Sequence, residues 1–315
     1  MISKIKPIIL FITNKDDFAV DYLIYKVKSN NIDYFRINSE DIIELYFSYN
    51  VDEIVLYSNN FRVEMDNVKS IYFRRCPNIF PNVTDVENSS YVNRERKEFF
   101  EGIYLSLNDR KWINPIYSTL KAERKLYQLK IAQKIGFLIP DTLVSNSPKE
   151  INDFYYKHNK DCIVKPISHG LQVTPNGYYS IYTSKLESEF KKQNEIFECP
   201  LYIQENIDNF RDIRCTVIGN NIFCVEIEKT NSNDVDWRNP NIKKQYKVHT
   251  LPKEIESKIL KLHKELNLIY SAIDFILTSD GIYYFLETNP AGEWVWLDNE
   301  LNLPIKEKII EELID

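Results

Sequence analysis

Residues 269–296, IYSAIDFILTSDGIYYFLETNPAGEWVW, decide how the rest of this chain is interpreted. The stretch contains two runs rich in aromatic and β-branched residues, joined by Asp280 and Gly281. An Asp-Gly pair between such runs is typical of a two-residue hairpin turn, whose central residues both need a positive φ. We therefore predict two antiparallel strands in which Ser279 pairs with Ile282.

Three oxygen-bearing side chains in this hairpin form a candidate metal site. Counting outward from the turn places Asp274 opposite Glu287, and strand alternation places Asn289 on the same face. All-oxygen ligands suit Mg²⁺, which usually keeps waters and substrate phosphates as its other ligands. An exposed hairpin with scattered acids is the alternative. Asp274 lies between Ile273 and Phe275, however, and acids inside apolar strands are seldom left unpaired.

Composition excludes several classes of protein. The 315 residues are 43% hydrophobic and 27% charged, as in an ordinary globular protein, and the net charge of −6 argues against general nucleic-acid binding. The five cysteines have no metal or redox spacing and suit reduced thiols, and the four histidines form no cluster that predicts zinc. The sequence has no segment long enough to be a membrane span. We predict a cytoplasmic protein with neither nucleic acid nor membrane as partner.

The first part of the chain alternates between strand and helix patterns. Residues 7–13 read as a buried strand, 16–29 as a helix and 33–37 as a strand, which predicts a small open α/β domain. The helix has apolar residues at helical spacing at Phe18, Tyr22 and Tyr25.

Two arginines follow the next predicted strand, residues 70–73. Ligands of open α/β sheets gather beyond the carboxyl ends of strands, where Arg74 and Arg75 could hold an anionic substrate or a phosphate. A solvated basic turn is the alternative.

The middle of the chain predicts two helices and a lysine-bearing strand. We expect a helix over residues 88–108, a linker at 112–115, and a second helix from an N-cap at Ser118 to about Gly136, which carries Lys125. Ser147, Pro148 and Glu150 form a capping box that begins another helix. Lys165 lies in the strand 161–167 between apolar residues, and an anionic partner would explain it.

The remaining segments complete the pattern. Residues 201–204 read as a strand, 211–228 as a hairpin, 251–266 as an amphipathic helix and 304–313 as a closing helix. The loop 168–177 is a weak candidate for a phosphate cover, because it has only two glycines.

Taken in order, these marks resemble the ATP-grasp superfamily. They are Lys125, Lys165, Glu205, Asp212-Ile213-Arg214, Trp237-Arg238-Asn239, and the set Asp274, Glu287 and Asn289. The Asp-Ile-Arg segment is similar to the ribosomal-protein glutamate ligases. The fuller resemblance is to the microviridin-type (graspetide) peptide maturases, and it rests on Phe73-Arg74-Arg75, AERKLYQ at 122–128, DWR at 236–238 and FLETNPAGEW at 285–294.

The resemblance implies an α/β and α+β chain with the ATP-grasp fold. It implies an N-terminal open α/β pre-ATP-grasp domain over residues 1–115, a central lid domain over 116–204, and a C-terminal antiparallel-sheet domain with the Mg²⁺ site over 205–315. It also implies roles for individual residues. Lys125 and Lys165 would contact phosphates, Glu205 and Asn206 would line the adenine hinge, Asp212 would lie near the ribose, and Asp274, Glu287 and Asn289 would hold Mg²⁺.

Two further arginines are the implied catalytic residues. Arg214 and Arg238 would steady an acyl phosphate, since guanidinium forks match its oxygens, and Arg238 would also contact ATP. Structural ion pairs with Asp212 and Asp236 are the alternative.

The implied activity is that of an ATP-dependent peptide ligase or macrocyclase. Such an enzyme activates Asp or Glu side chains of a ribosomal precursor peptide, which has a leader and a core, and joins them to Ser or Thr hydroxyls or Lys amines. A glutamate-ligase-like enzyme that adds amino acids to a protein or peptide is one alternative, and a non-catalytic peptide-binding relative is another. Homodimer formation is left open.

Overall fold

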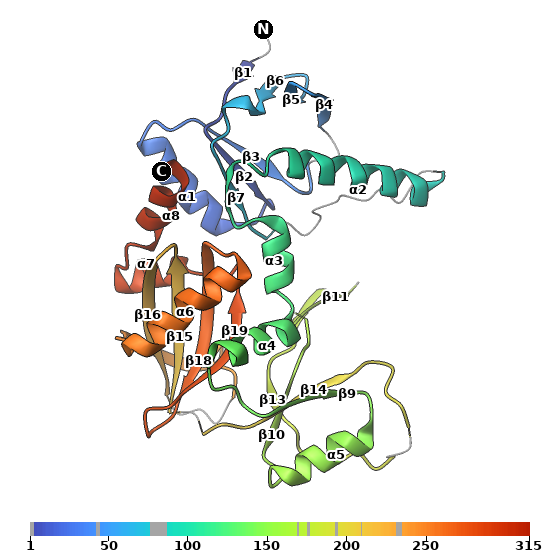
Figure 1. Ribbon diagram of the computed structural model, residues 1–315, viewed down its shortest axis with the longest axis vertical. Helices are drawn as coiled ribbons and strands as arrows, with labels where there is room; N and C mark the ends of the chain where they lie inside the picture. Colours follow the sequence, from blue (N-terminus) through green and yellow to red (C-terminus); the bar gives the residue numbers. More distant parts are fainter. Residues whose placement is uncertain are drawn as a thin grey trace.

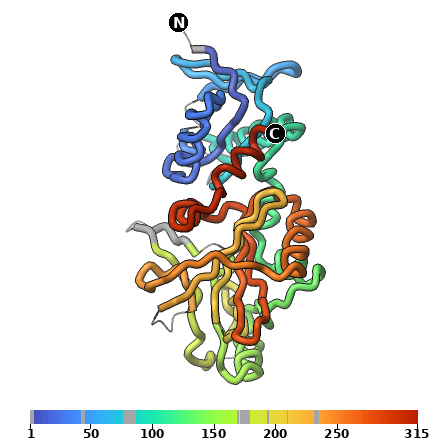
Figure 2. The backbone as a smooth tube through the Cα atoms, turned by 90° about the vertical axis from the view of Figure 1, so that its left-hand side faces the viewer, coloured from blue at the N-terminus to red at the C-terminus, as the bar shows by residue number. Residues whose placement is uncertain are grey.

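The structure, a computed structural model, describes residues 3–41, 45–75, 87–168, 170–174, 177–192, 195–208, 210–230 and 235–315. Figure 1 shows a parallel sheet with its helices at the top, a larger antiparallel sheet at the lower left and a small sheet with one helix at the lower right. Figure 2 shows the last helix, α8 (Ile305–Ile314), running between the N-terminal unit and the C-terminal sheet.

The N-terminal sheet has four parallel strands in the order β3-β2-β7-β8. Its elements are β2 (Ile9–Thr13), α1 (Phe18–Ser29), β3 (Tyr34–Asn38), β7 (Ser70–Phe73), α2 (Ser89–Ser106) and β8 (Lys111–Ile113). Every residue of β2 and β7 is buried, because the central strands of a parallel sheet are covered on both faces. The predicted open α/β arrangement is confirmed.

A second sheet beside it was not predicted. It has the order β1-β6-β5-β4 and consists of β1 (Ser3–Ile5), β4 (Tyr46–Asn50), β5 (Glu53–Tyr57) and β6 (Phe61–Glu64), followed by the 3₁₀ turn Met65–Asn67.

One prediction for this unit is wrong, and the buried face of its first helix differs from the residues that the sequence singled out. Helix α1 buries Ala19, Val20, Leu23, Ile24 and Val27, whereas Phe18 is 67% and Tyr25 78% exposed. The small aliphatic residues, which are fully apolar, occupy the core face in place of the larger aromatic ones. Residues 112–115 were predicted as a linker, but Trp112 and Ile113 belong to β8, the last strand of the sheet.

The middle of the chain forms two helices and the small sheet. These elements are α3 (Ile116–Ala122), α4 (Lys125–Ile135), β9 (Thr142–Ser145), α5 (Pro148–Lys157), β10 (Cys162–Lys165), β13 (Ser184–Lys185) and β14 (Leu201–Glu205), with the hairpin β11 (Leu171–Thr174) and β12 (Gly177–Ser180). The sheet order is β13-β10-β14-β9.

The structure confirms one predicted helix start here and corrects another. Ser147 accepts a hydrogen bond from the Glu150 N–H, as the capping box predicted. Ser118 is not an N-cap, because it lies inside α3; the predicted single helix is two, and Lys125 is the first residue of the second. Gly136 ends α4 with a φ of +97°, which favours glycine.

The C-terminal unit is an antiparallel sheet in the order β17-β16-β15-β18-β19. Its elements are β15 (Arg211–Ile218), β16 (Asn221–Thr230), β17 (Lys243–Val248), α6 (Lys253–Leu266), β18 (Tyr270–Leu277), β19 (Tyr283–Asn289), α7 (Val295–Leu301) and α8. β17 and α7 were not predicted, since β17 is rich in charge and α7 is short.

The turn between β18 and β19 differs from the prediction. The Thr278 N–H donates to the Ile282 carbonyl, so the loop has three residues, Ser279–Gly281. Of these only Gly281 has a positive φ, +84°. The predicted Ser279–Ile282 pair is therefore wrong, and the turn is a type I turn followed by a left-handed glycine.

The predicted pairing of Asp274 with Glu287 is nevertheless confirmed. Asp274 pairs with Glu287 and Phe275 with Phe285, so Leu286 is an extra residue in a β-bulge. The bulge compensates for the longer turn and brings the two acids opposite each other, as predicted.

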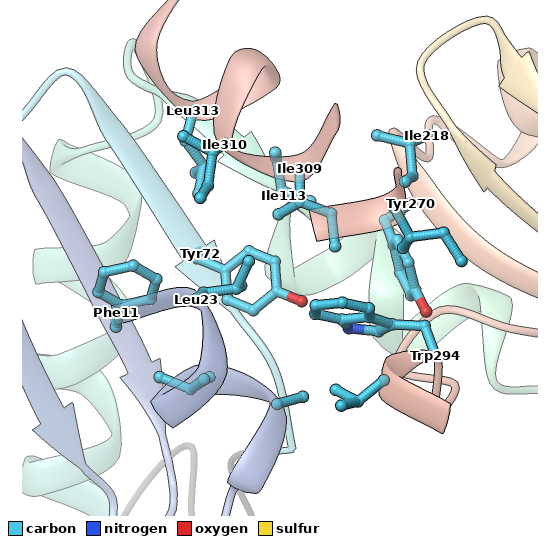
Figure 3. Close-up of a cluster of buried hydrophobic side chains, with 14 of the residues drawn as sticks. Phe11, Leu23, Tyr72, Ile113, Ile218, Tyr270, Trp294, Ile309, Ile310 and Leu313 are labelled. Carbon is cyan, nitrogen blue, oxygen red and sulfur yellow. The ribbon is translucent and has the colours of Figure 1, made fainter. Parts of the chain in front are cut away.

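A continuous hydrophobic core joins the N-terminal sheet to the C-terminal sheet. Figure 3 shows Phe11 and Tyr72 from the first unit, Tyr270 and Trp294 from the second, and residues of α8 between them. Trp294 is fully buried. The two sheets therefore pack as one body around this cluster.

Asn114 ties the same two units together through hydrogen bonds. Its Oδ1 accepts from the N–H groups of Ile269 and Tyr270, both at 2.8 Å. Its Nδ2 donates to the carbonyls of Tyr270 and Pro290, at 2.7 and 3.1 Å. The side chain is 1% exposed, so it satisfies backbone groups that water does not reach.

Two further sequence expectations concern cysteines and membranes. Cys215 and Cys224 face each other across β15 and β16, and the structure joins them in a disulfide, so the expectation of reduced thiols is wrong for this pair. Their separation of nine residues is no recognisable motif; only the hairpin register brings them together. In the described part of the chain, none of the helices is both long and apolar enough to cross a membrane.

We predict that Asn114→Ala lowers the free energy of unfolding by more than about 3 kcal/mol. The substitution leaves four backbone groups without their hydrogen-bond partner, and each lost partner costs about 1 kcal/mol or more. Urea denaturation measures this loss. Asn221→Ala is the control, since the only hydrogen bond of its side chain within the described residues goes to the Ile218 carbonyl at 3.3 Å. Equal losses in the two variants would contradict the role of Asn114.

Candidate active site

A cavity of about 320 Å³ lies between the small sheet and the C-terminal sheet. Five cationic and five acidic side chains line it together with apolar walls. The charged residues are Lys125, Lys165, Lys185, Lys229, Arg238, Asp208, Asp212, Asp236, Asp274 and Glu287. Of the residues that the sequence singled out, seven line this cavity: Lys125, Lys165, Asn206, Asp212, Arg238, Asp274 and Glu287.

The predicted metal ligands are brought together only in part. Asp274 and Glu287 are cross-strand partners, and both line the cavity. Asn289 pairs with Ala272, is exposed, and its Oδ1 accepts from the Ala291 N–H at 2.9 Å. Asn289 does not line the cavity, and its part in a metal site stays a prediction.

The two carboxylates influence each other's protonation. Burial raises the pKa of Asp274, and the charge of Glu287 raises it further, while Arg214 opposes both. Burial also acts to raise the pKa of Glu287, but Lys125, Arg238 and Lys165 outweigh it and lower that pKa. Two acids this close hold two charges only when cations surround them.

Cations reach Glu287 from two other parts of the fold. Lys125 Nζ, from the start of α4, lies 3.6 Å from Glu287 Oε2, and Arg238 Nη1 lies 3.2 Å from Glu287 Oε1. Lys125 also donates hydrogen bonds to the carbonyls of Pro166 and Ser168, at 2.8 and 3.1 Å. These bonds connect the start of α4 to the segment that follows β10.

Lys165 is a half-buried cation of the site. It extends from β10, with its Nζ 5.5 Å from the centre of the Tyr202 ring. Burial lowers the pKa of Lys165 to about 8; Glu287 acts to raise it, and Lys125 and Arg238 act to lower it. Burial makes the charged ammonium form of Lys165 unfavourable, so an anionic ligand beside it would stabilise that form.

Arg238 forms the structural ion pair that was the alternative to its catalytic role. Its Nε and Nη2 donate to the two oxygens of Asp236, at 2.9 and 2.8 Å. Asp236 is 6% exposed and also accepts from the Thr183 N–H at 3.2 Å. The two hydrogen bonds to Asp236 therefore fix the orientation of the Arg238 guanidinium, whose remaining nitrogen, Nη1, faces Glu287.

Arg214 pairs with a different acid from the one considered. Its Nη1 lies 3.0 Å from each oxygen of Asp274. Asp212 instead forms an ion pair with Lys229, whose Nζ lies 3.3 Å from Asp212 Oδ2. Arg214 is 6% exposed and lies just behind the cavity wall.

The two proposed hinge residues point differently. Glu205 Oε1 accepts from the Asp141 N–H at 2.7 Å, and Oε2 lies 3.5 Å from His158 Nδ1, so this side chain is directed away from the cavity. Asn206 lines the cavity and donates from Nδ2 to Asp161 Oδ1 at 3.0 Å.

The two N-terminal arginines lie outside the cavity. Arg74 is 2% exposed and binds Glu293 at 2.8 Å and Asp17 at 3.5 Å, so the solvated basic turn is wrong for it. Arg75 is half exposed and also binds Glu293, at 2.8 Å. Neither residue was expected to bind the C-terminal unit.

Sequence reasoning missed Lys185, Lys229 and the apolar walls Ile163, Ile276 and Leu286. Lys229 had a signal: strand alternation puts it on the same face as Val225 and Ile227. Lys165 was singled out for a related reason, its place between apolar residues of a strand.

The donor set fits a nucleotide with Mg²⁺. Two facing carboxylates offer hard oxygen ligands, and lysines and an arginine around them can meet phosphates. A cavity between two sheets with this charge pattern is what an ATP-dependent ligase requires, and it assigns the protein to that class.

Comparison with known families agrees. The chain belongs to the RimK-like ATP-grasp family, whose domain model matches residues 122–313. A model of the MvdD pre-ATP grasp domain matches residues 8–119. The predicted ATP-grasp fold, with its N-terminal open α/β pre-ATP-grasp region and C-terminal antiparallel sheet, is confirmed. The protein is an ATP-grasp ligase, and enzymes of this family use ATP and Mg²⁺.

Solved structures and a curated protein show the same likeness over nearly the whole chain. The macrocyclase MdnC, bound with precursor peptide MdnA, from Microcystis aeruginosa MRC is 26% identical; 97% of this chain and 99% of that chain align, with a TM-score of 0.84. A RiPP-associated ATP-grasp ligase from Chryseobacterium gregarium, in complex with ADP and a leader and core peptide, is 26% identical over 99% of this chain and 95% of that chain, with a TM-score of 0.80. The tetrahydromethanopterin:alpha-L-glutamate ligase of Methanocaldococcus jannaschii is 23% identical over 96% of this chain and 97% of its own length.

We predict that stability depends on pH through Lys165. Its pKa is about 8 in the folded protein and 10.5 ordinarily, so the unfolded chain binds more protons between these values, and stability rises with pH there. The unfolding free energy of the wild type should rise relative to that of Lys165→Met from about pH 8 to about pH 10, as urea denaturation measures. Parallel curves for the two proteins would contradict the lowered pKa.

Proposed function

We propose that this ligase acts on a ribosomal precursor peptide with a leader and a core. It activates Asp or Glu side chains of the core and joins them to Ser or Thr hydroxyls or Lys amines, which makes ester or amide crosslinks. The observation that carries this proposal is the cross-strand acid pair Asp274–Glu287, ringed by cations in a cavity between two sheets. The likeness to MdnC over 97% of the chain supports the choice of substrate.

The proposed residue roles are those that the family resemblance implies, and the lining of the cavity supports most of them. Asp274 and Glu287, with Asn289 as the third candidate, would hold Mg²⁺, which when bound supplies charge neutralisation at the terminal phosphates of ATP. Lys125 and Lys165 would contact those phosphates, since both already lie among the cations around Glu287. Glu205, Asn206 and Asp212 would serve the base and the ribose, with Asn206 and Asp212 on the cavity wall.

The proposed chemistry balances without any other reactant. A substrate carboxylate attacks the γ-phosphorus of ATP, which gives an acyl phosphate and ADP. A hydroxyl or amine then attacks the acyl carbon, phosphate leaves, and the nucleophile loses a proton. Arg238 and Arg214 would stabilise the acyl phosphate with their guanidinium donors.

Several broader assignments belong to the same proposal. The division into residues 1–115, 116–204 and 205–315 is our assignment of the pre-ATP-grasp, lid and metal-binding domains. A cytoplasmic location fits a substrate made on ribosomes. Arg74 and Arg75 remain candidates for substrate contact, with homodimer formation left open.

A glutamate-ligase-like activity is the second candidate. The likeness to the tetrahydromethanopterin:alpha-L-glutamate ligase favours it, as that protein aligns over 96% of this chain. Such an enzyme would take a free amino acid as nucleophile. Its ATP turnover would therefore depend on added glutamate, whereas the first proposal requires a peptide with acidic and hydroxyl or amine side chains.

ATP turnover measured with each partner separates the two candidates. The enzyme is supplied with free glutamate plus an acceptor peptide, or with a synthetic peptide that has a leader and a core containing Asp or Glu together with Ser, Thr or Lys. Loss of one water per crosslink, seen by mass spectrometry in the precursor alone, supports the peptide ligase. Mass gain by glutamyl units identifies the alternative, and absence of ATP turnover with every partner points to a non-catalytic relative.

We predict that Glu287→Gln lowers the rate of crosslinking at least about 100-fold, because it removes charge from the pair that would hold the metal. Peptide mass spectrometry measures the rate, and binding of the leader peptide should change little. Glu226→Gln is the matched control. Glu226 lies on the opposite face of the same sheet, held by Arg211 and His249 at 3.4 and 3.3 Å. Wild-type activity in the Glu287 variant would refute the metal assignment.

A further inference from the structure

The backbone segment Gly292–Glu293 lies between two arginines from different units of the fold. Arg74 follows strand β7 of the N-terminal sheet, and Arg214 lies on β15 of the C-terminal sheet. Both arginines are nearly fully buried, at 2% and 6% exposure. Buried guanidinium groups are costly unless they are well paired, so their contacts fix the local geometry.

The N-terminal side of this arrangement is anchored firmly. Arg74 Nη2 donates to Glu293 Oε1 at 2.8 Å and to the Gly292 carbonyl at 3.3 Å. Its Nη1 lies 3.5 Å from Asp17 Oδ1, and Asp17 is the N-cap of α1 and accepts from the Thr13 hydroxyl at 2.6 Å. Arg74 is thus held by the body of the parallel sheet.

The C-terminal side leads to the acid pair. Arg214 Nη2 donates to the Glu293 carbonyl at 3.3 Å, while Nη1 reaches both oxygens of Asp274 at 3.0 Å. The segment packs closely against this guanidinium, since a Cβ on Gly292 would lie 2.7 Å from Arg214 Nη2. The Tyr270 hydroxyl donates a hydrogen bond to the Gly292 carbonyl at 2.7 Å, which restrains the segment further.

We propose that Arg74 is a positioning residue for the ligase reaction. It holds the Gly292–Glu293 segment against Arg214 and so sets the orientation of Arg214 and of the Asp274 carboxylate. The N-terminal unit, none of whose described residues lines the cavity, thereby takes part in building the site. This inference rests on the proposed function for its kinetic consequence, but the placement of the segment can be measured independently.

Two other roles for Arg74 predict different results. A merely structural ion pair between units would affect stability alone. Direct contact with the peptide substrate would raise KM for the peptide. Lys111 provides a matched control for the first, because it joins β8 to Glu312 of α8 at 2.8 Å in another ion pair between the two units. Within the described part of the chain it forms no ion pair or hydrogen bond with the segment Gly292–Glu293.

The experiment compares Arg74→Met, Arg74→Lys, Glu293→Gln and the control Lys111→Met. We expect Arg74→Met to raise amide exchange of Gly292 and Glu293 at least about 10-fold and to lower kcat at least about 10-fold at saturating ATP and peptide. Binding of ADP with Mg²⁺ should weaken at least about 5-fold by calorimetry, and binding of ADP without Mg²⁺ less than about 2-fold. Arg74→Lys should recover part of each effect, and Lys111→Met should show none.

Glu293→Gln keeps the test decisive if Arg74→Met fails to fold, because the Glu293 side chain is 42% exposed and the substitution removes the negative charge that pairs with Arg74 and with Arg75. Equal effects in the Arg74 and Lys111 variants, without faster exchange in the segment, would overturn the proposal in favour of a structural pair. A raised KM for the peptide with unchanged kcat would overturn it in favour of substrate contact. If the wild type proves inactive on peptides, the proposed function fails, while the exchange and ADP measurements still decide the role of Arg74.

Discussion

The cross-strand pair of Asp274 and Glu287 is the constraint on which the rest of the site depends. Two carboxylates side by side in a largely buried sheet cannot both stay ionised without nearby positive charge. The fold supplies that charge separately to each acid: Arg214 to Asp274, and Lys125 with Arg238 to Glu287. The acids thus remain in a low-dielectric site where a metal ion can bind the carboxylates and phosphates can pair with the surrounding cations.

These charges come from segments far apart in the chain, so the site exists only when the units are packed. Lys125 begins a helix, Lys165 ends a strand of the small sheet, and Arg238 lies in a loop held by Asp236. The buried cluster around Trp294 and the hydrogen bonds of Asn114 hold the N-terminal and C-terminal sheets in one arrangement. Stability of that packing and geometry of the site are therefore linked.

The sequence predicted the elements better than their faces and ends. Strong apolar runs and the capping box at Ser147 were confirmed, because local patterning determines them. The helix start at Ser118 was wrong, because this residue lies inside α3. Phe18, one of the apolar residues singled out in α1, is exposed, since which side of a helix meets the core depends on neighbours distant in sequence. The cross-strand contact of Cys215 with Cys224 had no sequence signal for the same reason.

By itself the sequence determined that an acid pair, a set of lysines and arginines, and an ATP-grasp order of motifs are present. Their residue types and spacing carry that information, because strand alternation and hairpin pairing act over short distances. Only the tertiary structure decided which cation meets which acid: Arg214 binds Asp274 and not Asp212, and Arg74 is a buried bridge to Glu293. Ion pairs between strands distant in sequence and between separate units depend on strand order and on how sheets and helices pack, and no local pattern in the chain encodes that.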